Sequence, residues 1–338
     1  MFNYKWYLKD GYPAKNIENH KHKVFTTFAC GGGSSMGYKL AGYDVIAAND
    51  IDPKMAKIYK ENHNPKYFFE CPIKDLLNKK LPKELYDIDI LDGSPPCSTF
   101  SIAGKREKKW GKKYKFREGQ AIQILDDLFF QFIKIAKELK PKIIIAENVK
   151  GMLAGNAKGY VLEIKEQLNE LGYVVQVFLL NAATMGIPQK RERVFFICRR
   201  NNLNLLDIKI SFDNKSIPLK EILIDNGKKL NNTKEELWNK CDNGKSFSTV
   251  HKKGNYFNSI KLNKNKVLPT ITASRGGLLA HPDIPYRISN ETLILGSSFP
   301  LDYNFIGIDV KYIVGMSVPP VMMAQISYQV YKQWLNKL

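Results

Sequence analysis

Short apolar runs alternate with amphipathic segments through the first two hundred residues of the chain. Runs of four to seven residues at this spacing are typical of strands, and the longer segments between them have helical periodicity. Strands are predicted at Val24–Phe28, Val45–Ala48, Ile88–Leu91, Ile143–Ala146, Val174–Leu180 and Val194–Ile197. Helices are predicted from Ser34 to Ala41, after Pro53, at Leu125–Leu139 and at Val161–Leu171. Buried strands that alternate with helices indicate an α/β fold with a doubly wound, mostly parallel sheet.

The pattern breaks after Ile197. Residues 199–266 are rich in Asn, Lys and Gly, with only a weak strand signal at Ile208–Phe212. Regular structure is expected to return at Val267–Ala273, and Pro320–Leu338 reads as a closing helix. We therefore expect a main domain at 1–198 with an extension at 1–22, a small loop-rich domain at 199–266, and a return to the main domain at 267–338.

Polar and glycine residues gather where the predicted strands end. Because ligands bind beyond the carboxyl ends of parallel strands, this convergence predicts one shared site. The glycine cluster does not fit the dinucleotide fingerprint, since Met36 stands where the third glycine belongs, so a simple tight turn is an alternative. Asp50 suits ribose hydroxyls, although it could instead cap the helix before Pro53. The groups concerned are Gly31–Gly33, Asp50, Asp92–Cys97 and Glu147-Asn148.

Cys97 differs from the other cysteines in its setting. Pro95 and Pro96 restrict the backbone just before it, so a thiolate there would be rigidly aimed. A lone cysteine is usually a buried packing residue, and this is the interpretation for Cys30, Cys71, Cys198 and Cys241. The five cysteines show no paired spacing, which predicts neither a metal site nor a disulfide framework and favours a reducing cytoplasm.

The formal net charge is +19, with 52 basic and 33 acidic residues. Residues 105–117 contain eight basic residues and one acidic residue, interleaved with Trp110, Tyr114 and Phe116. This pattern favours a nucleic-acid partner, although a solvated lysine-rich surface is the alternative. No apolar run approaches the roughly 20 residues of a membrane span, and the polar N-terminus does not predict export.

Five short motifs stand out along the chain. They are Gly93–Ser101, with a Pro-Cys step, followed by Glu147–Val149, Gln189–Arg193, Pro269–Thr272 and Gly315–Pro320. Together they resemble, in the family's order, the motifs of the cytosine-C5 DNA methyltransferases of the bacterial and phage restriction-modification type. In this resemblance, which extends from Phe28 to the C-terminus, Gly93–Ser101 corresponds to the catalytic Pro-Cys motif.

The resemblance implies a Rossmann-like methyltransferase fold, S-adenosyl-L-methionine as cofactor with S-adenosyl-L-homocysteine as product, and a reaction at a cytosine flipped out of duplex DNA. Cys97 would add to C6 of the base, so that C5 becomes nucleophilic. Glu147, beside Asn148, would hold the N3/N4 edge, while Arg193 contacts O2 and fixes Glu147, supported by Arg191. The alternatives are a structural salt bridge for Glu147 and a phosphate-facing pair for the arginines.

The same resemblance assigns a cofactor set and a DNA set. The cofactor set is Phe28, Ala29, Cys30, Gly31, Gly32, Gly33, Asp50, Ile51, Pro72, Ile73, Asp92, Pro96, Leu128, Met316 and Ser317. The DNA set is Ser98, Ser101, Lys105, Arg106, Gln189, Arg199, Lys252, Lys253 and Asn255. Three departures from the family pattern touch the cofactor set: Cys30 replaces a glycine, Pro72 an aspartate and Met316 an asparagine.

The implied protein is a cytoplasmic, monomeric modification enzyme of bacterial or phage origin. Its partner is double-stranded DNA, it methylates a short specific site read by residues 199–266, and a cognate restriction endonuclease would be a functional counterpart. Two alternatives stay open. One is an RNA substrate, since one eukaryotic branch of the family modifies transfer RNA; the other is a non-catalytic DNA-binding protein, suggested by the three departures.

Overall fold

The computed structural model describes residues 2–96, 113–114, 123–124, 127–155, 157–274 and 276–338. The chain divides into two compact units. The sheet unit comprises Tyr12–Asn181, Glu192–Ser211 and Met323–Leu338, and the loop-rich unit comprises Met1–Gly11, Ala182–Arg191 and Phe212–Met322. The loop-rich unit is therefore larger than the segment 199–266, and the functional boundaries expected from the sequence stay a prediction.

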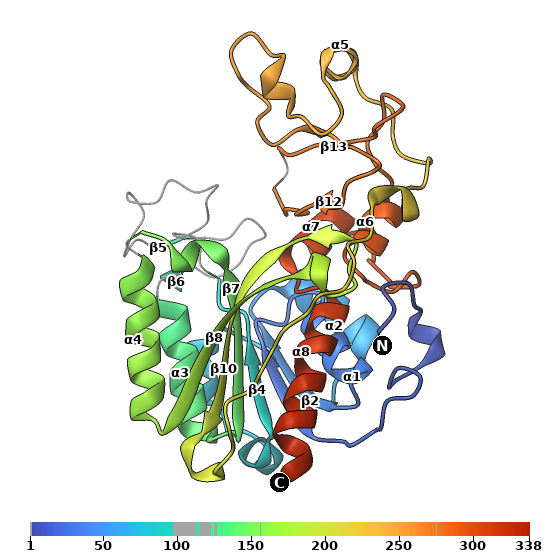
Figure 1. The fold of residues 1–338 in the computed structure, drawn as a ribbon. Coiled ribbons are helices and arrows are strands. Elements are labelled where there is room, and N and C mark those ends of the chain that lie inside the picture. The colour runs from blue at the N-terminus through green and yellow to red at the C-terminus, as the bar shows by residue number, and fades with distance from the viewer. Residues whose placement is uncertain (1, 97–112, 115–122, 125–126, 156, 275) are drawn as a thin grey trace. The chain divides into compact units, whose positions relative to one another are not determined.

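A seven-stranded sheet forms the centre of the sheet unit, in the order β3-β2-β1-β4-β7-β10-β8 (Figure 1). Every neighbouring pair from β3 to β7 is parallel, and β10 is antiparallel to both of its neighbours. The strands are β1 (Lys23–Thr27), β2 (Asp44–Asp50), β3 (Tyr67–Glu70), β4 (Ile90–Gly93), β7 (Ile143–Val149), β8 (Tyr173–Asn181) and β10 (Glu192–Arg200). The expected doubly wound α/β fold is confirmed.

Helices cover both faces of this sheet (Figure 1). On one face α3 (Leu128–Leu139) and α4 (Ala157–Glu170) pack over a core that includes Phe25, Phe132 and Ile144. On the other face lie α1 (Gly33–Leu40), α2 (Pro53–His63) and most of α8 (Pro320–Gln333). The chain order reverses between β1 and β4, and a doubly wound sheet binds its ligands at that point, beyond the carboxyl ends of the strands.

Most elements predicted from the sequence are present, and the differences have local causes. Tyr67–Glu70 is a strand that the apolar pattern missed, because it is a half-buried edge strand. Ile208–Phe212 contains no strand, so that prediction was wrong. Ile208 is buried instead, and its backbone N–H and carbonyl group form hydrogen bonds with the side-chain amide of Gln176. Of Val267–Ala273 only Leu268–Pro269 is strand.

The loop-rich unit contains little regular structure, as the sequence predicted for this region. Its elements are β9 (Gln189–Lys190), α5 (Asn232–Lys240), β11 (Ile260–Lys261), β12 (Leu268–Pro269), β13 (Leu279–Ala280), α6 (Asn290–Gly296) and α7 (Val310–Met316). A small core around Leu237, Phe247 and Leu278 holds part of it together. The pair β5 (Lys113–Tyr114) and β6 (Gln123–Ile124) belongs to the sheet unit. No helix in the described part of the chain is long and apolar enough to cross a membrane.

Candidate functional site

The turn after β1 bends sharply at the switch point of the sheet. Phe28, Cys30 and Gly32 all have positive φ angles, of 55°, 47° and 74°. Gly32 cannot be replaced by a larger residue, because a Cβ there would lie 2.0 Å from Nε2 of His63. The turn therefore packs directly on α2, and its shape requires a glycine at position 32 but tolerates a cysteine at position 30.

Asp50 ends β2 and is joined to this turn. Its buried carboxylate accepts hydrogen bonds from the backbone N–H groups of Cys30, at 2.7 Å, and of Asp52, at 2.9 Å. Burial raises the pKa of Asp50 to about 6, although these backbone hydrogen bonds oppose the shift. Asp50 therefore fixes the turn, and Asp52, rather than Asp50, caps the helix that begins at Pro53.

Asp92 lies beneath the same edge of the sheet, at the end of β4. Its carboxylate accepts hydrogen bonds from the hydroxyl groups of Thr26 (2.8 Å) and Tyr38 (3.1 Å). Burial raises the pKa of Asp92 to about 7. The expectation of a direct cofactor contact is corrected, because Asp92 is only 1% exposed and lies beneath the surface. The sequence did not identify Thr26 and Tyr38 as hydrogen-bond partners of Asp92, because only the fold brings them together.

Glu147 and Asn148 end β7, next to β4 and β10. Glu147 is buried and pairs with Arg193, whose Nε lies 2.9 Å from the carboxylate Oε1. Asn148 donates its side-chain N–H to the carbonyl oxygen of Pro95 at 3.1 Å and accepts the backbone N–H of Val149 at 2.8 Å. The structure thus brings together Glu147, Asn148 and Arg193, and it ties the backbone two residues before Cys97 to β7.

Five predicted residues lie outside the described part of the chain: Cys97, Ser98, Ser101, Lys105 and Arg106. The cofactor candidates Ala29, Gly31, Gly33, Ile73 and Leu128 are buried, and Ile51, Pro72 and Pro96 are half-buried. Met316 and Ser317 belong to the loop-rich unit, where Met316 is 39% exposed and Ser317 is buried.

Arg191 and Gln189 are buried in the loop-rich unit. The guanidinium of Arg191 donates to the carbonyl oxygens of Ile271, Gly315 and Ser317, at 2.9–3.1 Å. The alternative of a phosphate-facing surface residue is therefore wrong for Arg191. Its side chain instead binds the backbone of two other motifs, Pro269–Thr272 and Gly315–Pro320.

Gln189 was expected to contact DNA, and this is corrected. It is fully buried; its amide donates to the carbonyl of Gly296 at 2.9 Å and accepts the N–H of Ile271 at 3.1 Å. Because the side chain is fully buried and bonded inside the unit, it is not accessible to a base.

Arg199 is also corrected as a DNA contact. It pairs in register with Ile143, at the start of β7, whereas Arg193 pairs with Val149 at the end. Six residues of strand, roughly 20 Å, separate it from the predicted site, and its guanidinium lies 3.3 Å from Asp207. The other three candidates, Lys252, Lys253 and Asn255, are exposed on a loop of the loop-rich unit.

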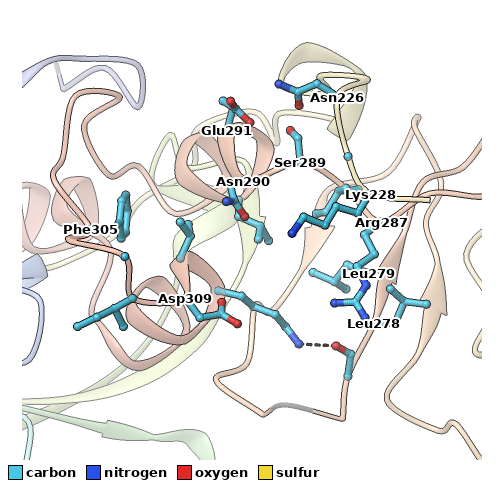
Figure 2. A pocket seen from close by; sticks show the side chains of 18 residues that line it. Asn226, Lys228, Leu278, Leu279, Arg287, Ser289, Asn290, Glu291, Phe305 and Asp309 are labelled. Atoms are coloured by element: carbon cyan, nitrogen blue, oxygen red, sulfur yellow. Dashed lines mark hydrogen bonds between the residues drawn. The ribbon is translucent and has the colours of Figure 1, made fainter. Parts of the chain in front are cut away.

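The loop-rich unit also contains a cavity of about 720 Å³ that the sequence did not predict. Lys228 and Arg287 lie on one side of it and Phe305 on the other, while Asn290 and Glu291 project from α6 (Figure 2). No single stretch of sequence carries a signal for it, because its walls come from four separate segments.

Comparisons with known proteins identify the family of the chain. A family model described as C-5 cytosine-specific DNA methylase matches residues 22–332. The Type II methyltransferase M.FnuDI of Fusobacterium nucleatum is 32% identical over 221 residues, 65% of this chain and 56% of that protein. M.NgoFVII of Neisseria gonorrhoeae is 26% identical over 339 residues, 90% of this chain and 85% of that one.

Solved structures show the same fold. One described as a DNA modification methyltransferase encoded within an E. coli prophage superposes with a TM-score of 0.72, at 19% identity, over 93% of this chain and 99% of that one. The chain spans little more than half the length of several curated relatives, M.FnuDI among them. Since the family model covers nearly the whole sequence, from residue 22 to residue 332, the chain belongs to the C-5 cytosine-specific DNA methylase family.

Proposed function

We propose that this protein is a DNA (cytosine-5-)-methyltransferase that transfers the methyl group of S-adenosyl-L-methionine to C5 of a cytosine flipped out of duplex DNA. The observation that carries the proposal is the buried ion pair between Glu147 and Arg193, next to the Asn148 tether of the Pro95 backbone. A carboxylate and a guanidinium held together at a strand end match the donor and acceptor pattern of a cytosine edge.

Cys97 is the proposed nucleophile. Its thiolate forms a bond to C6, and the electrons of the C5–C6 double bond move into the ring, where Glu147 stabilises the protonated N3. C5 then takes the methyl group, and the donor would leave as S-adenosyl-L-homocysteine. Loss of the C5 proton to water restores the C5–C6 double bond as the C6–S bond breaks, which returns the thiolate.

Arg193 is proposed to contact the cytosine O2 through Nη2, since its Nε pairs with Glu147 and its Nη1 donates to the backbone carbonyl oxygen of Glu192 at 2.8 Å. Asn148 acts as a positioning residue, because its side chain binds the backbone that leads to Cys97 and not a reacting atom. Arg191, with its three backbone partners in the loop-rich unit, supports the reaction only through the fold.

The described residues fit the cofactor at the turn after β1. Phe28 and Ile51 are half-buried and would hold the adenosine, and Asp50, at the end of β2, would accept the ribose hydroxyls. Cys30 adopts the left-handed conformation that a glycine would favour there, so this departure leaves the shape of the turn intact. S-adenosyl-L-methionine, when bound, supplies an electrophilic methyl group.

Duplex DNA is the proposed partner, and a cognate restriction endonuclease the functional counterpart in a restriction-modification system. The net charge of +19 supports a polyanionic partner. We further propose a monomer that works in a bacterial or phage-infected cytoplasm, with residues 199–266 as the main source of site recognition.

Bisulfite sequencing of unmethylated genomic DNA, after incubation with the protein and S-adenosyl-L-methionine, tests the proposal. We expect protected cytosines in one short repeated context, and none with Cys97→Ala, because the substitution removes the proposed nucleophile. Protection that persists in Cys97→Ala would refute the assigned chemistry. Protected cytosines in transfer RNA but not in DNA would establish the RNA alternative.

A further inference from the structure

The cavity of the loop-rich unit has three basic side chains in its lining. They are Lys228, Arg287 and Lys311, which come from three separate segments of the chain. The cavity volume of about 720 Å³ lies within the range of roughly 300–1,000 Å³ that is typical of sites for small molecules. All of its lining residues belong to the loop-rich unit, so the cavity is complete within that unit.

Backbone contacts hold Lys228 and Arg287 side by side. The backbone N–H of Arg287 donates to the carbonyl oxygen of Lys228 at 2.8 Å. Gly227 lets the two segments approach each other, because a Cβ at this position would lie 1.8 Å from the carbonyl oxygen of Arg287. Both side chains extend from the same side of the cavity (Figure 2). The fold therefore fixes the positions from which these two cations reach into the cavity.

Lys311 adds a third positive charge from α7. Its ammonium group donates hydrogen bonds to the carbonyl oxygens of Ser274, at 2.9 Å, and of Gly277. Burial lowers the pKa of Lys311, the carboxylate of Asp309 opposes this shift, and the positive charge of Arg287 adds to it. The effect of Arg287 means that the two cations lie close enough to repel each other.

The protein itself offers these cations little compensation. The side chains of Lys228 and Arg287 form no hydrogen bond or ion pair with any residue that the structure describes. Two carboxylates also line the cavity, but Asp309 caps α7 by accepting the backbone N–H of Tyr312, and Glu291 forms no ion pair with a described residue. Like charges that lie together repel each other until an anion binds between them. The cationic side of the cavity therefore favours an anionic ligand.

The rest of the lining suits an organic group joined to that anion. Phe305 lies on the side opposite Lys228 and Arg287, and Asn290 and Glu291 project from α6 (Figure 2). An aromatic ring offers an apolar face to a base, and amide and carboxylate groups can bond amino and hydroxyl groups of a nucleoside. A phosphate alone would leave most of the cavity unfilled.

We propose that this cavity binds a nucleoside phosphate, with the phosphate held by Lys228, Arg287 and Lys311 and the base on the side of Phe305. Arginine suits a phosphate, because its planar guanidinium can bond two of the oxygens at once. The inference goes beyond the proposed function, since binding at this site requires no methyl transfer. The nucleotide can be free in solution or part of a nucleic acid, and both carry the same phosphate and base.

Isothermal titration calorimetry with adenosine monophosphate tests the site. The whole chain is first saturated with S-adenosyl-L-homocysteine, so that the nucleotide does not enter the proposed cofactor site. We expect saturable binding with a Kd below about 1 mM, and weaker binding of inorganic phosphate, which lacks the base. Arg287→Gln and Lys228→Gln should each weaken binding roughly 10-fold, the loss of one hydrogen bond to a charged group.

Lys229→Gln is the matched control. Lys229 is an exposed neighbour of Lys228 that pairs with Glu235 at 3.5 Å and does not line the cavity. Its substitution removes the same charge and should leave the affinity for adenosine monophosphate unchanged. Asn290→Ala should weaken the binding of the nucleotide but not that of inorganic phosphate, because its amide would bond the nucleoside.

Fluorescently labelled duplex DNA, titrated over a range of salt concentrations, separates the two sources of the nucleotide. If the nucleotide belongs to a nucleic acid, Arg287→Gln should weaken DNA binding and reduce the slope of log affinity against log salt by about 0.9, and Lys229→Gln should not. The inference would be overturned if Arg287→Gln and Lys228→Gln changed neither the binding of adenosine monophosphate nor that of DNA. Bisulfite sequencing reports on methyl transfer separately, so the two proposals can fail independently.

Discussion

Cys30 and Asp92 show how single residues at the sheet edge depend on their surroundings. Cys30 takes a left-handed conformation, with a cost of about 1–2 kcal/mol, and the hydrogen bond from its N–H to Asp50 and the contact of its sulfur with Met55 offset part of this. Asp92 is a carboxyl group in a buried position, and it takes up a proton at a much higher pH there than in water.

The raised pKa of Asp92 predicts a specific dependence of stability on pH. Its folded-state pKa of about 7 exceeds the ordinary value of about 3.9, so the stability it contributes is complete below about pH 4 and is lost as the pH rises through 7. Asp92→Asn removes this titration. The free energy of unfolding of Asp92→Asn, minus that of the original chain, should therefore rise between pH 5 and 7, by at most about 1.4 kcal/mol per pH unit.

Urea unfolding at pH 5, 6, 7 and 8 measures this difference. The comparison between the two chains cancels the contribution of Asp50, whose pKa is raised to about 6 for the same reason. A difference in unfolding free energy that stays constant from pH 5 to pH 8 would contradict the raised pKa of Asp92.

At the scale of elements, the ends of β4, β7 and β10 carry the proposed chemistry. Parallel β4 and β7 end at the same edge of the sheet, and antiparallel β10 begins there. Glu147, Asn148 and Arg193 therefore lie close together, although Glu147 and Arg193 are 46 positions apart in the sequence. The motifs Glu147–Val149 and Gln189–Arg193, which resemble the family pattern, identified these three residues before the structure was known. The partners of Gln189 and Arg191 were not identifiable, because they are backbone carbonyls and amides that tertiary packing supplies.

Asn148→Ala is expected to lower kcat and leave KM for DNA nearly unchanged. The substitution frees the Pro95 carbonyl and with it the backbone that aims Cys97, and misplacement of a reacting group by about 1 Å costs up to roughly 100-fold in rate. Asn148→Asp is the matched control. It keeps the acceptor for the N–H of Val149 but has no donor for Pro95, so it should lose rate as well. A fully active Asn148→Asp would show that the tether to Pro95 is not needed.

At the scale of the whole molecule, two compact units divide the tasks proposed for the chain. The sheet unit carries the buried ion pair and the turn after β1, and the loop-rich unit carries the exposed lysines at 252 and 253. The net charge of +19 belongs to the chain as a whole and predicts strong attraction to any nucleic acid.

The affinity for duplex DNA should therefore fall steeply with salt. If six to ten phosphates are neutralised, affinity should drop roughly 10³- to 10⁵-fold between 50 and 200 mM monovalent salt. Filter binding or anisotropy at four salt concentrations gives the slope directly. A slope near zero would mean that the positive charge is spread over a solvated surface and does not meet the phosphate backbone.

The fold class, most elements of the sheet unit and the polar groups at its strand ends followed from the sequence, because burial on both faces and turn chemistry are local properties of the chain. The roles expected for the motif residues followed from the family resemblance. The tertiary structure decided which polar groups face a ligand and which are used inside the protein. Gln189 and Arg199 have the residue types of DNA contacts, yet one is fully buried and the other lies at the opposite end of the sheet. Conversely, Thr26 and Tyr38 had no role in the sequence, and the fold brings both hydroxyl groups to the carboxylate of Asp92.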